Sequence, residues 1–73
     1  MYENESLEFA KRMYMLEDEL ESINAEAHSN FIQDSGDYWR QLGVEDWEEA
    51  FNKDPMTSLG FEEELRSLIS MSK

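Results

Sequence analysis

A stripe of apolar residues along the first third of the chain constrains the fold more than any other feature. Its members recur at alternating steps of four and three residues, which is the spacing of one helix face. They are Phe9, Met13, Leu16, Leu20, Ile23 and Ala27. The positions between them are mostly charged, so this face must be covered by the rest of the chain, by a second copy or by another protein.

We expect the stripe to lie on one long helix that covers about residues 5–29. The sequence Asp-Ser-Gly-Asp at 34–37 indicates a loop, because these residue types favour turns. No strand-like alternation extends beyond a few residues. The expected fold is therefore all-α: a single small domain over residues 1–73, in which two or three shorter helices pack on the long N-terminal helix.

Two shorter helices are expected in the second half of the chain. The first begins at Val44 and carries Trp47 and Phe51 on its inner side. It stops at Asp54, because the residue before a proline is disfavoured in helical geometry. The last helix is expected to begin at 57–58, where threonine and serine can cap it.

The chain is strongly acidic. Eighteen acidic residues oppose six basic ones, which gives a net charge of −12, and both halves of the chain share the excess. Such a surface repels nucleic acid and anionic lipid and attracts basic protein surfaces. No apolar run approaches the roughly 20 residues of a membrane-spanning helix, and the N-terminus is acidic where a signal peptide would be basic. We therefore expect an intracellular, cytoplasmic protein.

The excess of carboxylates is larger than solubility requires, and self-repulsion works against a small core. Our hypothesis is that they imitate nucleic-acid phosphates and occupy the basic groove of a nucleic-acid-binding protein, which they inhibit or regulate. In composition the chain resembles the compact acidic proteins that phages and mobile elements use against host factors. The alternative is that the charge serves solubility alone. The expected partner-binding carboxylates are Glu17, Asp18, Glu21, Glu45, Asp46, Glu48, Glu49, Glu62, Glu63 and Glu64.

Large apolar side chains are expected to anchor the partner, because aromatic residues carry much of the energy at interfaces. The candidates are Tyr38, Trp39, Met13 and Met15. Tyr38 and Trp39 are adjacent, so one of the two is expected to face outward.

The stripe also fits a short coiled-coil seam, with Met13, Leu20 and Ala27 at one heptad position and Phe9, Leu16 and Ile23 at the other. A monomer core and a homodimer seam therefore both stay open. The seam implies the alternative function, a helical dimerisation or adaptor subunit whose stripe packs on a partner's helices. A third interpretation is an acidic, aromatic-rich segment that folds only on its partner.

Nothing in the sequence indicates catalysis. The chain has one histidine, His28, and no cysteine. It has no calcium-loop spacing, no phosphate-binding glycine loop and no nucleophile elbow. A chain of this length also has little interior in which to shift the pKa of a catalytic group. We therefore expect no enzymatic activity, no cofactor and no metal.

Overall fold

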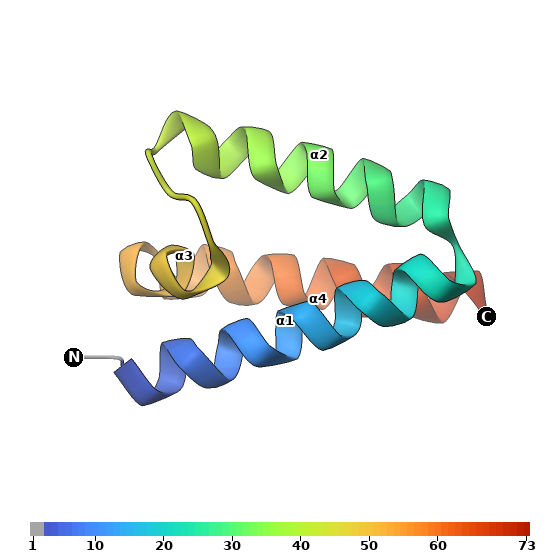
Figure 1. The fold of residues 1–73 in the computed structure, drawn as a ribbon, viewed down its shortest axis with the longest axis horizontal. Helices are drawn as coiled ribbons and strands as arrows, with labels where there is room; N and C mark the ends of the chain where they lie inside the picture. The colour runs from blue at the N-terminus through green and yellow to red at the C-terminus, as the bar shows by residue number, and fades with distance from the viewer. Residues whose placement is uncertain (1–2) are drawn as a thin grey trace.

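The computed structural model describes residues 3–73, and this part of the chain forms four helices (Figure 1). The fold is all-α, as predicted, and α1 contacts each of the other helices. None of the helices between residues 3 and 73 is long and apolar enough to cross a membrane. The helices are α1 (Glu3–Ile23), α2 (Ala25–Gln41), α3 (Trp47–Lys53) and α4 (Pro55–Ser72).

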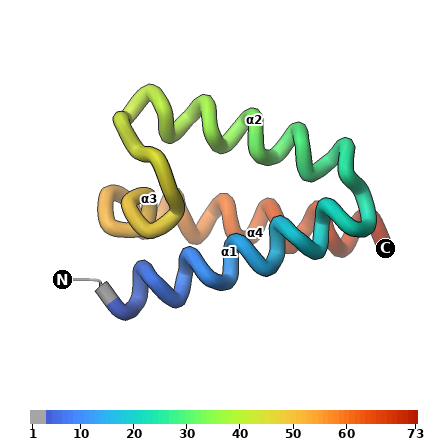
Figure 2. The backbone as a smooth tube through the Cα atoms, viewed as in Figure 1, coloured from blue at the N-terminus to red at the C-terminus, as the bar shows by residue number. Residues whose placement is uncertain are grey.

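The two longest helices, α1 and α4, run side by side in the same direction, and α2 returns in the opposite direction (Figure 1). Figure 2 shows the backbone leaving α2, passing through residues 42–46 and entering α3 beside the start of α4. The helix α3 packs on both α1 and α4. The bundle measures 36 × 24 × 16 Å along its principal axes.

The N-terminal helix ends at Ile23, and the prediction that it continues to about residue 29 is wrong. Asn24 leaves helical geometry (φ −159°, ψ 84°) and caps α2, because its side-chain oxygen accepts a hydrogen bond from the backbone N–H of Ala27 at 3.1 Å. Its amide nitrogen donates to Ser72 Oγ at 3.1 Å. Asn24 therefore begins the second helix and also ties this corner to the end of α4.

The predicted loop at 34–37 is also wrong, because these residues lie inside α2. Phe31, Ser35 and Trp39 are spaced by four residues and are all buried, so they form the inner face of this helix. The Ser35 hydroxyl donates to the Phe31 carbonyl at 2.8 Å. Burial of the two aromatic rings outweighs the weak helix propensity of the serine and glycine between them.

Gly36 provides a test of this helix. A Cβ atom at Gly36 would meet only Arg40 Nη2, at 3.7 Å, which is an ordinary contact. Gly36→Ala is therefore expected to raise the free energy of unfolding by about 0.5–1 kcal/mol, because alanine loses less conformational entropy in a helix. Thermal unfolding followed by circular dichroism measures this change.

Gly43 supplies the matched control, because its φ of +75° is unfavourable for other residues. Gly43→Ala is expected to lower the free energy of unfolding by about 1 kcal/mol. If Gly36→Ala also proved destabilising, the helical assignment of residues 34–37 would be wrong.

Gly43 terminates α2 in a Schellman motif. The N–H of Val44 donates to the Trp39 carbonyl at 3.0 Å, and the N–H of Gly43 donates to the Arg40 carbonyl at 3.1 Å. The next helix then begins three residues later than predicted, at Trp47. Its N-cap is Asp46, whose side chain accepts from the N–H of Glu49 at 2.8 Å.

Asp54 ends α3, as the Asp-Pro sequence predicted, and it also begins α4. Its N–H donates to the Ala50 carbonyl at 2.9 Å, and its carboxylate accepts from the N–H and the hydroxyl of Thr57 at 3.1 and 2.7 Å. The hydrogen bond from the Thr57 hydroxyl, and then that from its N–H, lower the pKa of Asp54. The last helix begins at Pro55 instead of at 57–58, because the first turn of a helix does not need the N–H that proline lacks.

Trp47 lies at the centre of an aromatic core. Together with Phe51 it is buried, which confirms the predicted inner side of this helix. Its ring contacts one or more rings from each of the other three helices, so the short α3 links the whole bundle. The ring centroids within 6.4 Å of Trp47 are those of Phe9, Phe31, Trp39 and Phe61.

Candidate functional site

Most of the N-terminal stripe packs within a single chain. Phe9, Met13 and Leu20 are fully buried, and Leu16 and Ala27 pack against the same core. Ile23 differs, because 41% of its surface is exposed. A homodimer seam on these residues would have to replace the packing that they already make within one chain.

The four predicted anchors divide into two buried and two exposed side chains. Met13 is fully buried and Trp39 is only 5% exposed, so neither presents a surface to a partner in this conformation. Met15 is 72% exposed and Tyr38 is 40% exposed. Tyr38 packs edge-on against Trp39, with 5.0 Å between ring centroids, so it is the outward-facing member of the adjacent pair.

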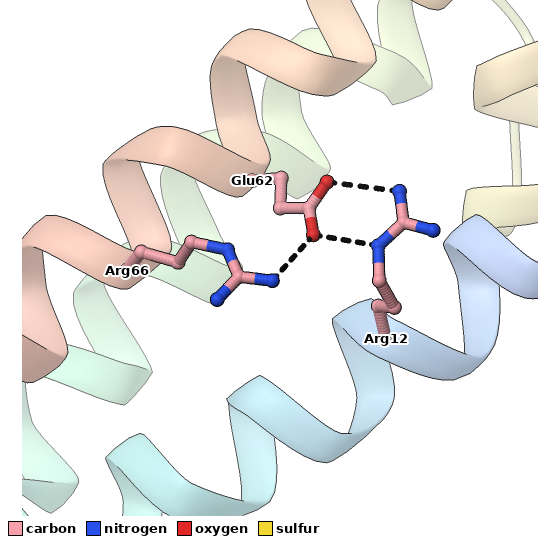
Figure 3. Close-up of polar contacts among 3 residues, drawn as sticks. All are labelled: Arg12, Glu62 and Arg66. Carbon is pink, nitrogen blue, oxygen red and sulfur yellow. Dashed lines mark hydrogen bonds and ion pairs between the residues drawn. The ribbon is translucent and has the colours of Figure 1, made fainter.

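Glu62, one of the predicted partner-binding carboxylates, is buried between α1 and α4 (Figure 3). Arg12 donates to it through two nitrogens, Nε to Oε2 at 2.8 Å and Nη2 to Oε1 at 3.1 Å. Arg66 donates to Oε2 at 3.1 Å. The hydrogen bonds from Arg12 are the largest cause of the lowered pKa of Glu62. We call these three residues the Glu62 clamp; it joins two helices and leaves little of the carboxylate for a partner.

Glu17 is the second predicted carboxylate that lies in the interior. Its Oε2 accepts a hydrogen bond from Trp47 Nε1 at 2.8 Å, while its other oxygen has no hydrogen-bond partner among the described residues. Burial raises the pKa of Glu17, and the Trp47 hydrogen bond and the charge of His28 partly oppose that rise. A carboxylate whose charged form is disfavoured by burial is a candidate for a functional site.

A cleft of about 520 Å³ opens beside Glu17, between α1, α2 and the segment that leads into α3. Its volume is in the range of sites that bind small ligands or single side chains. The indole Nε1–H of Trp39 is buried and has no acceptor in the described structure, which is uncommon in folded proteins. The apolar walls of the cleft are formed by Tyr14, Ile32, Trp39, Val44 and Trp47.

Four carboxylates line this cleft or act on the residues in its wall, and we call them the acidic rim. Two of them line the cleft directly, and the other two act electrostatically on Glu17 or Tyr14 in its wall. They are Asp18, Glu45, Asp46 and Glu48. Among the predicted partner-binding carboxylates, Glu17 on α1 and the pair Glu45 and Asp46 before α3 thus line one cleft.

Tyr14 is one of the cleft residues that sequence reasoning missed. Its periodicity places it on the flank of the apolar stripe, but it is 47% exposed at the cleft. Burial of the hydroxyl and the nearby carboxylates raise its pKa, against a hydrogen bond with the Trp47 backbone. No local pattern distinguishes such a residue from an ordinary core aromatic.

The remaining predicted carboxylates are exposed but do not line the cleft: Glu21, Glu49, Glu63 and Glu64. Most basic residues are already paired within the chain. Arg12 and Arg66 hold Glu62, Arg40 pairs with Asp37 at 3.3 Å, and Lys73 pairs with Glu19 at 3.1 Å. The surface therefore has few cations that are not already paired with a carboxylate.

Comparison with known proteins adds no functional assignment. No protein-family model matches the chain, and no curated protein or solved structure is significantly similar to it. Within residues 4–73, no three histidine, cysteine or acidic side chains are grouped so that they could hold a metal ion. Function must therefore be inferred from the charge and shape of this chain.

Proposed function

We propose that this protein is a non-enzymatic binding protein that occupies a basic surface on a larger protein. The supporting observation is the distribution of charge. From residue 4 onward, every carboxylate except Glu17, Asp54 and Glu62 is exposed, whereas four of the six bases are engaged in ion pairs within the chain. Such a surface accelerates encounter with a basic partner and selects against acidic ones.

The favoured target is a protein that binds nucleic acid. Its binding groove must be basic in order to neutralise phosphates, and carboxylates displayed on rigid helices can occupy that groove in their place. Binding would then compete with the nucleic acid and inhibit or regulate the target inside the cell. A phage or mobile element would gain most from such an inhibitor.

The alternative role, a homodimer or adaptor built on the N-terminal stripe, has less support. Its central residues Phe9, Met13 and Leu20 already form the core of one chain. An exchange of that core for a partner's helices would expose the aromatic rings of α3 that pack on it.

The test is a measurement of affinity against salt. A partner captured from a lysate at low salt is purified, and its dissociation constant is measured between about 50 and 500 mM salt. We expect the affinity to fall steeply, because added salt shortens the screening length to a few ångström. We also expect DNA to compete for the partner. An affinity that stayed constant over this range would indicate an apolar interface and contradict the proposal.

Charge reversal on the acidic rim refines this test. Glu45→Lys combined with Glu48→Lys is expected to weaken partner binding by about tenfold or more, because attraction becomes repulsion at the interface. Glu63→Lys combined with Glu64→Lys changes the net charge equally and is the matched control. An equal loss in both variants would mean that charge acts without a defined surface.

A further inference from the structure

The geometry points to the cleft beside Glu17 as a pocket for one arginine residue of a basic partner. This inference rests on the proposed function and makes it more specific, because it names the group that anchors the complex. The pocket is separate from the exposed carboxylates on α4 and requires a defined insertion in addition to general charge attraction.

The first argument is the chemistry of the cleft floor and walls. Glu17 is held by one hydrogen bond from Trp47, and its second oxygen has no partner within the described chain. The indoles of Trp39 and Trp47 line the same cleft. A guanidinium group is flat, donates hydrogen bonds to a carboxylate and stacks on aromatic rings, whereas an ammonium group is a compact, strongly hydrated charge.

The second argument is the unsatisfied donor of Trp39. Its Nε1–H is buried without an acceptor, and an indole N–H can only donate. An arginine side chain has no acceptor to offer it, whereas the main-chain carbonyl of a peptide is an acceptor. The lining of the cleft thus combines a carboxylate with one oxygen unpartnered in the described chain and an indole donor without an acceptor, and an arginine residue in a peptide carries both a cation and a carbonyl acceptor.

The third argument is charge complementarity at the entrance. Glu45 and Asp46 line the cleft, and the charges of Asp18 and Glu48 act on Glu17 and Tyr14 in its wall. Arg40 is a cation among the lining residues, and it pairs with Asp37. The net field at the entrance is therefore negative and favours a positively charged guest.

The experiment titrates the 73-residue chain with the peptide acetyl-Ala-Arg-Ala-amide, and follows the indole N–H signals of Trp39 and Trp47 by NMR. We expect both signals to shift in a saturable manner. The matched peptide with citrulline in place of arginine has the same shape without the charge, and it should bind about tenfold more weakly or worse. Saturable shifts elsewhere on the surface, with neither indole affected, would overturn the inference.

Two variants test the residues directly. Glu17→Gln keeps an acceptor for Trp47 and should fold. Its affinity for the arginine peptide should be about tenfold lower, because the negative charge is lost. Arg40→Gln should strengthen binding, because it removes a like charge from the lining. Glu63→Gln should leave it unchanged. An unaltered affinity in Glu17→Gln, or equal binding of a lysine peptide, would contradict an arginine pocket.

Failure of this inference can be distinguished from failure of the proposed function. Suppose that Glu17→Gln bound the partner with normal affinity, while charge reversal on the acidic rim lowered that affinity. The cleft would then be excluded as the anchor, and the proposed acidic binding function would be retained. If the arginine peptide bound in the cleft while partner affinity did not depend on salt, the arginine pocket would be supported and the proposed function would be contradicted.

Discussion

Replacement of Leu20 with aspartate is expected to unfold the protein. Leu20 has no exposed surface, so the change removes a packed side chain, at a cost of about 2–5 kcal/mol, and also places an unpaired carboxylate in the core. A chain of 73 residues has a stability of roughly 4–11 kcal/mol at the usual value per residue. Far-UV circular dichroism of the variant should show loss of most helical signal at 25 °C.

Ile23→Asp is the matched control, because it makes the same kind of change on the same stripe at a position that is 41% exposed. This variant should remain folded, with a melting temperature within a few degrees of the wild type, and sedimentation should give the same mass. If Leu20→Asp stayed folded but lost a dimer or a partner, the stripe would be an interface and the core assignment would be wrong.

Glu62→Gln is expected to lower the free energy of unfolding by about 2 kcal/mol at pH 7, because it removes the charge-assisted hydrogen bonds of the Glu62 clamp. For a domain of this size the melting temperature should fall by about 8–16 °C. Glu63→Gln, the exposed neighbour, should have almost no effect.

The same variant gives a pH signature. The pKa of Glu62 is lowered from its ordinary value of 4.5, so the native state binds this proton more weakly than the unfolded chain does. The stabilisation is therefore complete above pH 4.5 and is lost as the pH falls through the lowered native pKa. Chemical denaturation between pH 7 and pH 3 should show the gap between wild type and Glu62→Gln closing. A gap that stayed constant would mean that Glu62 does not act through its charge.

The contribution of Glu17 to stability depends on pH in the opposite direction, because burial raises the pKa of Glu17. A raised pKa favours the protonated native state, so its contribution to stability is present at low pH and is lost as the pH rises through the native pKa. The contributions of these two buried carboxylates to stability thus change in opposite directions as the pH falls. The reason is that Glu62 has two guanidinium partners, whereas Glu17 has a single indole donor.

Local patterns were sufficient to predict the fold class and several elements. The period of the N-terminal stripe predicted an amphipathic helix whose apolar face is covered, and Phe9, Met13 and Leu20 are indeed buried. Asp54 before a proline predicted the end of α3, and the spacing of Trp47 and Phe51 predicted its inner side. These features depend on backbone geometry and on contacts a few residues apart, which a sequence displays directly.

Other boundaries depended on contacts that a local pattern does not contain. Asn24 divides the expected long helix, and its bond to Ser72 connects residues 48 positions apart. The segment 34–37 has a turn-like composition, yet it is helical because Phe31 and Trp39 on either side of it enter a shared core. Local propensity of a few tenths of a kcal/mol per residue cannot outweigh the burial of two aromatic rings.

The order of residues by itself determined that this protein is acidic and helical, because net charge and apolar periodicity can both be read from the chain without its fold. Only the tertiary structure decided which carboxylates can meet a partner. Glu62 lies next to Glu63 and Glu64 in the sequence, but Arg12, 50 positions away, makes it a structural residue. Glu17 likewise gains its cleft from α2 and α3. Whether a charged side chain is buried, and which residue it pairs with, depends on segments that are far apart in the sequence and meet only in the folded chain.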